Sequence, residues 1–176
     1  MIDGVLSFCM IAKNEERDLP KCLDSVRHLA GELIVVDTGS TNRTAALAAE
    51  YGARVIPFDF TTVDFAAARN CAIGHARGRW ILMLDADETL DAAGAPAVEK
   101  LVAEDRNAGY FLERHNRSTS SHGPGSSSEP GSSRELAPDI PFRDFVVRLF
   151  PNRPGIRYRG PIYLSLVARR SEPRFW

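Results

Sequence analysis

Short apolar runs alternate with segments of helical periodicity over the first hundred residues of the chain. Four of these runs have the length of strands, and each is followed closely by polar residues: Val5–Ile11, Leu33–Val36, Arg54–Phe58 and Trp80–Leu84. The segments between them place apolar residues three and four positions apart, as on the buried face of a helix. Strands that alternate with helices predict an α/β fold, in which a mostly parallel sheet carries helices on both faces.

The second half of the chain is divided by a stretch of Ser, Gly and Pro. Helix and strand patterns in this half are short: Pro96–Val102, Tyr110–Leu112, Phe145–Phe150 and Ile156–Tyr158. Residues 118–138 have almost nothing to bury and are predicted to be a flexible loop. We therefore expect one α/β domain, with a core at 1–117, the flexible loop at 118–138 and an incomplete C-terminal part at 139–176.

The bulk properties exclude several classes of protein. A formal net charge of -1 gives no sign of a nucleic-acid-binding surface. No apolar stretch approaches the roughly 20 residues of a membrane span, and the N-terminus lacks the pattern of a signal peptide. The cysteines are scattered and odd in number, which indicates reduced thiols. We expect a cytoplasmic protein, with peripheral membrane contact left open.

The strongest chemical signal is Asp85-Ala86-Asp87-Glu88, directly after the run Trp80–Leu84. Alternate residues of an extended chain point to the same side, so Asp85 and Asp87 would converge on one ligand. Neighbouring carboxylates repel each other, and a divalent cation such as Mg²⁺ or Mn²⁺ would relieve that repulsion. The alternative is an exposed acidic turn that caps the next helix.

Each early strand is followed by hydrogen-bond acceptors: Asn14 and Glu15, then Asp37, then Asp59, and then Asp85 and Asp87. The carboxyl ends of parallel strands meet at one edge of a sheet, where α/β folds bind ligands. Such a row of acceptors suits a ligand with imide, amide and hydroxyl donors. A metal ion would bind any phosphates of that ligand. No GxGxxG follows the first strand and no GxxxxGK[ST] occurs, which argues against a dinucleotide fingerprint and a P-loop. Taken alone, Asp37 could instead form a turn with Thr38-Gly39.

Four ordered motifs resemble those of the family 2 glycosyltransferases: Cys9–Glu16, Val35–Thr44, Asp64–Asn70 and Leu84–Glu88. The resemblance covers roughly residues 5–116 and is to short bacterial sequences like the lipopolysaccharide core biosynthesis glycosyltransferases. It implies the GT-A fold, a Rossmann-like sheet. It also implies an enzyme that uses a nucleotide-activated sugar.

The resemblance also implies roles for individual residues. Those that would bind the nucleotide are Ala12, Asn14, Glu15, Asp37, Arg69, Asn70 and Asp85. Asp37 would accept a hydrogen bond from the uracil imide. Asp85 would contact the ribose or a metal-bound water. Asp87 would ligate Mg²⁺ or Mn²⁺ between the two phosphates, with Asp85 as the second metal candidate.

The C-terminal part departs from this pattern. The related sequences carry an Ile-His-Glu motif after the Arg-Leu-Phe strand, but here Tyr163 and Leu164 stand where His and Glu are expected. Inverting transfer needs a general base to deprotonate the acceptor. Either the C-terminus is truncated or altered, or another carboxylate is the base, with Glu88, Glu113 and Asp144 as candidates.

The sequence therefore predicts a metal-dependent glycosyltransferase that uses a UDP-sugar, with inversion. Its acceptor would be a lipopolysaccharide core sugar, another cell-envelope glycan, a lipid-linked acceptor or a protein side chain. Two alternatives stay open. One is a nucleotide-sugar-binding module without transferase activity. The other is a nucleotidyltransferase, against which the absence of a Gly-rich basic loop after the first strand argues.

Overall fold

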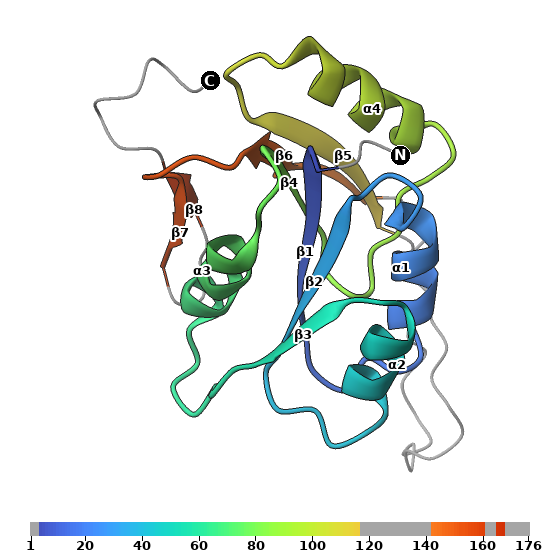
Figure 1. Ribbon diagram of the computed structural model, residues 1–176, viewed down its shortest axis with the longest axis vertical. Helices are drawn as coiled ribbons and strands as arrows, with labels where there is room; N and C mark the ends of the chain where they lie inside the picture. The colour runs from blue at the N-terminus through green and yellow to red at the C-terminus, as the bar shows by residue number, and fades with distance from the viewer. Residues whose placement is uncertain (1–3, 117–141, 161–164, 168–176) are drawn as a thin grey trace, which may run out of the picture.

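The computed structural model (Figure 1) describes residues 4–116, 142–160 and 165–167. Its main sheet has six strands in the order β3-β2-β1-β4-β6-β5. Their bounds are Leu6–Ala12 (β1), Glu32–Asp37 (β2), Arg54–Pro57 (β3), Trp80–Met83 (β4), Tyr110–Asn116 (β5) and Phe142–Pro151 (β6). The first four strands are parallel, and β6 runs antiparallel to both β4 and β5. The predicted mostly parallel sheet is confirmed.

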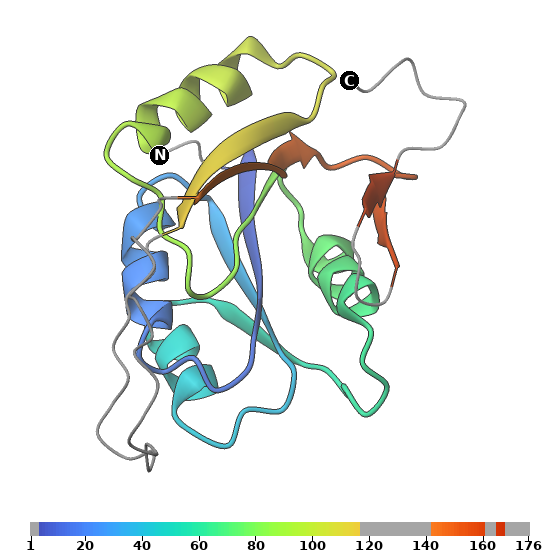
Figure 2. The ribbon, with the colours of Figure 1, turned by 180° about the vertical axis from the view of Figure 1, so that it is seen from behind.

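Helices cover both faces of the sheet, as predicted. One face packs against α1 (Leu19–Val26), α2 (Thr44–Glu50) and α4 (Gly94–Glu104). The other face packs against α3 (Phe65–His75) and a small sheet of β7 (Arg157–Arg159) and β8 (Ser165–Val167). Figures 1 and 2 show α3 beside β7 and β8 from both sides of the molecule.

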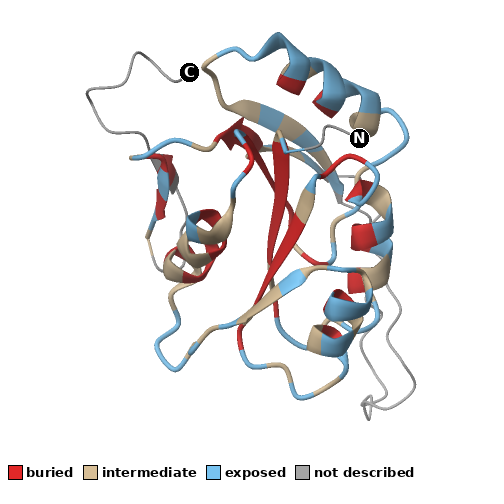
Figure 3. Ribbon diagram, in the orientation of Figure 1, coloured by how far each residue is buried: buried red, intermediate tan, exposed pale blue. Residues whose placement is uncertain are grey.

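Apolar side chains point to both faces of β1 in alternation, which explains why this strand lies inside the sheet and not at its edge. Phe8 and Met10 face the layer of α1, whereas Cys9 faces the layer of α3, and all three side chains are fully buried. Figure 3 shows β4 buried along its length and β1 buried at all but one residue, with exposed residues on the outer faces of the helices. A strand buried on both faces reads as a continuous apolar run, which is the pattern of Val5–Ile11 and Trp80–Leu84.

Some elements differ from the sequence-based expectation. β5 and β6 are longer than the apolar patterns Tyr110–Leu112 and Phe145–Phe150, because charged residues continue both strands. β8 was not predicted. The flexible loop predicted at 118–138, and the positions of Tyr163 and Leu164, lie outside the described residues. Within the described part of the chain, no helix is long and apolar enough to cross a membrane.

A partly buried polar network closes the amino-terminal edge of the sheet, opposite the strand ends that carry Asp37 and Asp85. The Ser7 hydroxyl donates to the Glu32 carboxylate at 2.5 Å, and the backbone N–H of Gly78 donates to Ser7 Oγ at 2.8 Å. The backbone N–H of Arg77 also donates to Glu32, at 2.6 Å. The network holds the start of β1, the start of β2 and the turn before β4 together, so we assign it a structural role.

Replacing Gly78 with Ala is expected to lower the free energy of unfolding by about 1–3 kcal/mol, because overpacking forces backbone shifts. An added Cβ would lie 2.7 Å from the Ser7 backbone nitrogen and 2.9 Å from the Val5 carbonyl oxygen. Gly74 in α3 is the matched control, since a Cβ there meets nothing within 4 Å. Gly74→Ala should raise stability by up to about 1 kcal/mol. Urea denaturation measures both, and equal midpoints for the two variants would contradict the packing argument.

Candidate functional site

The loops after β1 and β2 are joined by Asn14, at the edge of the sheet where the parallel strands end. Asn14 has a φ of 60°, the left-handed region that asparagine tolerates better than most residues. Its backbone N–H donates to Ser40 Oγ at 2.9 Å, and its side-chain Oδ1 accepts from the Thr41 N–H at 2.8 Å. Asn14 therefore holds the two loops side by side, and a nucleotide contact for it stays a prediction.

Asp37 lies at the end of β2, and its carboxylate organises the loop that follows. The Ser40 N–H donates to both carboxylate oxygens of Asp37, at 3.3 and 3.2 Å. The neighbouring carbonyl of Ala12 accepts from the Thr38 N–H at 3.0 Å and from the Thr38 hydroxyl at 3.2 Å. The local turn around Asp37 is thus present, and each carboxylate oxygen keeps lone pairs for a ligand.

Asp85, just beyond β4, is held by two buried arginines. Arg69 of α3 donates to one oxygen of the Asp85 carboxylate, and Arg148 of β6 donates to the other at 2.7 Å. Burial by itself raises the pKa of Asp85, but the charges of Arg148 and Arg69 outweigh it and lower the pKa below its ordinary value. Asp85 is therefore a fixed carboxylate anion, with both of its oxygens already engaged.

A β-bulge places Arg148 at this site. Tyr110 pairs with Leu149, but the next residue, Phe111, pairs with Val147, so Arg148 is an extra residue in β6. The Arg148 side chain is only 6% exposed and also donates to Glu88 at 2.5 Å. Bulges commonly redirect a side chain next to a binding site. The register shift explains why a strand arginine reaches the loop after β4.

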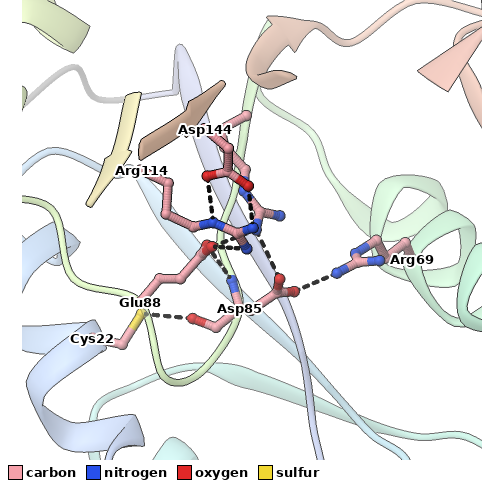
Figure 4. Close-up of polar contacts among 7 residues, drawn as sticks. Cys22, Arg69, Asp85, Glu88, Arg114 and Asp144 are labelled. Carbon is pink, nitrogen blue, oxygen red and sulfur yellow. Dashed lines mark hydrogen bonds and ion pairs between the residues drawn. The ribbon is translucent and has the colours of Figure 1, made fainter. Parts of the chain in front are cut away.

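Glu88 connects the two halves of this cluster, as Figure 4 shows. One of its oxygens accepts from the backbone N–H of Asp85 at 3.0 Å, and the other accepts from Arg148 and, at 3.4 Å, from Arg114. Arg114 also pairs with Asp144, donating through Nε at 2.9 Å. Three carboxylates and three guanidinium groups thus form one network around the end of β4: Asp85, Glu88, Asp144, Arg69, Arg114 and Arg148.

Asp87 stands apart from this network. Its side chain is exposed and makes no hydrogen bond or ion pair with the described residues. The pKa of Glu15, which follows β1, is raised first by burial and second by the negative charge of Asp87. The carboxylates of Glu15 and Asp87 are therefore close enough to interact electrostatically. The loop after β4 therefore presents two engaged carboxylates, Asp85 and Glu88, and one available carboxylate, Asp87.

This donor set fits a cation bound together with a phosphate ligand. Within residues 4–116, 142–160 and 165–167, no three His, Cys, Asp or Glu side chains gather to hold a metal by themselves. Mg²⁺ is usually bound through one or two carboxylates plus substrate phosphates, with water completing the shell. Asp87 could supply such a carboxylate, while Asp85 shares its oxygens with arginines. The metal roles of both residues stay predictions.

The three candidate bases are all paired with cations. Glu113 accepts from His115 and Arg143, which lower its pKa, and Arg114 lowers the pKa of Asp144. A general base works best when its pKa lies near the operating pH, and these shifts move the pKa away from it. Glu88 is paired with Arg114 and Arg148. The assignment of the base therefore stays open.

Asn70 pairs with the backbone of β7. Its amide nitrogen donates to the Tyr158 carbonyl at 2.9 Å, and its amide oxygen accepts from the Tyr158 N–H at 2.9 Å. This pairing fixes β7 against α3 and sets the Tyr158 ring under the Arg69 guanidinium, 5.5 Å away. The nucleotide contact predicted for Asn70 stays untested.

Sequence reasoning assigned no definite role to Arg114, Arg148 or Tyr158. Arg114 and Asp144 lie opposite each other on β5 and β6. Their opposite charges in neighbouring strands were the signal available in the sequence. The bulge at Arg148 gives no comparable signal in the sequence.

Comparisons with known proteins place the chain in a family. The family model for glycosyl transferase family 2 matches residues 7–157. A TPR repeat-containing protein of Synechococcus elongatus is 35% identical over 175 residues, which is 97% of this chain and 38% of that protein. The lipopolysaccharide core biosynthesis glycosyltransferase LpsC of Rhizobium meliloti is 35% identical over 113 residues, 62% of this chain and 42% of that protein. The chain therefore spans about two fifths of the length of these two relatives.

Solved structures show the same fold. S. aureus TarS in complex with UDP superposes with a TM-score of 0.55 at 18% identity, over 84% of this chain and 47% of that chain. A structure described as a mycobacterial protein gives a TM-score of 0.51 at 23% identity, over 60% of this chain and 39% of that chain. The similarity to TarS supports the GT-A fold expected from the four motifs.

Proposed function

The chain belongs to glycosyl transferase family 2, and on this premise we propose that it transfers a sugar from a UDP-sugar to a glycan acceptor. The transfer depends on Mg²⁺ or Mn²⁺ and inverts the anomeric centre. The observation that carries the proposal is the pair of carboxylates after β4. Asp85 is fixed by two arginines, and Asp87 is exposed and unpaired among the described residues.

The nucleoside would lie at the ends of β1 and β2. Asp37 keeps lone pairs that can accept from the uracil imide, and Glu15 borders the same edge of the sheet. TarS, whose fold is similar, has been solved in complex with UDP and with UDP-GlcNAc, which supports a UDP-sugar as the donor. Because β1 and β2 are parallel neighbours, their loops approach one ligand from the same side.

The chemistry explains the need for a cation. Negative charge builds up on the diphosphate as UDP leaves, and a bound Mg²⁺ or Mn²⁺ stabilises that charge. Asp87 would hold the cation. Asp85, through its ion pairs with Arg69 and Arg148, would keep the loop in one conformation so that Asp87 stays in place.

Relatives of this chain bear on the class of acceptor. LpsC is named for lipopolysaccharide core biosynthesis, and SunS of Bacillus subtilis, 35% identical over 79 residues, is named a glycosyltransferase. A cell-envelope glycan is therefore the acceptor class we favour. Lipid-linked and protein acceptors are tested in the same assay.

Calorimetry of UDP binding tests the proposal. We expect UDP to bind in the presence of Mn²⁺ and to bind at least about tenfold more weakly in EDTA, since the cation carries much of the phosphate interaction. A UDP-release assay over a panel of UDP-sugars and acceptors then tests for transfer. Binding without turnover would identify a nucleotide-sugar-binding module, and release of pyrophosphate would identify a nucleotidyltransferase. The absence of UDP binding by the folded chain would overturn the donor site.

A further inference from the structure

A cavity of about 430 Å³ lies next to Asp85, on the side of β5 and β6. Its polar wall is formed by three arginines and one carboxylate: Arg69, Arg114, Arg148 and Asp85. The apolar wall includes Phe145 and Val147 of β6 and Leu166 of β8. The cavity therefore borders the proposed donor site but lies away from the loops after β1 and β2, where the nucleoside would bind.

More guanidinium groups than carboxylates line the cavity. Glu88 and Asp144, which complete the ion pairs of Arg114 and Arg148, are not among the described residues that line it. A ligand in the cavity would thus meet three guanidinium groups and a single carboxylate. Guanidinium groups bind carboxylate and phosphate through paired N–H donors, so this wall favours an anionic group.

The hydrogen-bond donors also outnumber the acceptors here. Within the described part of the chain, Arg69 and Arg148 make all their hydrogen bonds through Nη2 alone, although a guanidinium carries five N–H donors. Arg69 Nε and the Tyr158 hydroxyl are both buried without a partner in the described residues. Burial raises the pKa of Tyr158 to about 12, so its hydroxyl remains a donor at neutral pH.

Part of the cavity lining is apolar and open to solvent. Phe145 is 66% exposed and Phe111 is 57% exposed, which is unusual for large apolar side chains. Both border the cavity. An occupant of matching chemistry would place an anionic group against the arginines and an apolar part against the phenylalanines.

We propose that this cavity is an acceptor subsite that takes a carboxylate or phosphate group of the acceptor. The proposal rests on the proposed glycosyltransferase function, because that function makes the side of Asp85 away from the nucleoside the acceptor side. Arg114 is the specificity-determining residue, since it is the most accessible of the three guanidinium groups. Its side chain is 38% exposed, against 8% for Arg69 and 6% for Arg148.

Two variants with opposite expected effects test the subsite. Phenyl phosphate, benzoate and the neutral control benzyl alcohol are titrated into the chain with saturating UDP and Mg²⁺, so that the diphosphate position is already occupied. Arg114→Gln should weaken binding of the anions about tenfold, which corresponds to one hydrogen bond to a charged group. Asp144→Asn should tighten it several-fold, because it removes the carboxylate that competes for Arg114.

Arg143→Gln is the matched control. Arg143 also lies on β6 and pairs with Glu113 of β5, but it is not among the described residues that line the cavity. It should leave the affinity for both anions unchanged. Preferential binding of phenyl phosphate would assign a phosphate-bearing acceptor, and preferential binding of benzoate a carboxylate-bearing one.

The outcomes separate the subsite from the proposed function. If UDP binds but neither anion binds better than benzyl alcohol, the subsite is overturned and the donor site stands. Weakened binding in both Arg114→Gln and Asp144→Asn would show that the ion pair is structural, and it would also overturn the subsite. If UDP fails to bind, the proposed function fails and the assignment to an acceptor fails with it.

Discussion

Asp87→Asn is expected to abolish the cation dependence of UDP binding and to lower sugar transfer at least about a hundredfold, which is about 2.7 kcal/mol of transition-state stabilisation. Asn has the shape of Asp but lacks the charge that holds the cation. Because Asp87 is exposed and makes no hydrogen bond or ion pair with the described residues, the free energy of unfolding should not change. UDP calorimetry, UDP release and urea denaturation on the same preparation measure all three quantities.

Two control variants sharpen this test. Glu99→Gln on the exposed face of α4 removes the same charge outside the loop after β4, and it should leave UDP binding unchanged. Asp85→Asn should weaken UDP binding and also lower stability, because it breaks the ion pairs with Arg69 and Arg148. Equal UDP affinity with and without Mn²⁺ in the wild type, or an unchanged cation effect in Asp87→Asn, would refute the metal role of Asp87.

Arg148→Met should lower the free energy of unfolding by about 3 kcal/mol at neutral pH, the low end of the range for breaking a buried ion pair. The substitution leaves Asp85 and Glu88, whose side chains are 30% and 14% exposed, with one arginine each. Met fills much of the volume of the arginine stem, so the loss reports mainly the charge. Urea denaturation of wild type and variant gives the difference.

The pH dependence of Arg148→Met has a defined sign. In the wild type the pKa of Asp85 is lowered, so its contribution to stability is present above the unfolded pKa and is lost as the pH falls through the folded pKa. The variant has already lost much of that contribution. The difference in stability between wild type and variant should therefore shrink as the pH falls below the ordinary pKa of an aspartate.

Arg143→Met is the control for the ion-pair argument. Arg143 lies on the same strand and pairs with Glu113, but its side chain is 63% exposed. Exposed pairs contribute at most about 1 kcal/mol. Equal destabilisation by the Arg148 and Arg143 variants would show that the buried network contributes no more to stability than a surface ion pair.

Local patterns predicted the N-terminal half of the fold well. The apolar runs of β1 and β4 are buried on both faces, and Asp64 caps α3 by accepting from the Ala67 N–H at 2.8 Å, as expected for an aspartate before a helix. These features depend on neighbours in the sequence. The antiparallel placement of β6 between β4 and β5 depends on a partner many residues away, so periodicity alone could not reveal it.

The sequence by itself determined the α/β fold and the row of polar residues at the strand ends, because alternation and strand length are local properties. It also placed Asp85 and Asp87 together after β4. Only the tertiary structure decided that their roles differ. A bulge in β6 and the packing of α3 bring Arg148 and Arg69 onto Asp85 and leave Asp87 without an ion pair among the described residues. Contacts between residues far apart in the chain set this difference, and no pattern within the four residues Asp85–Glu88 contains it.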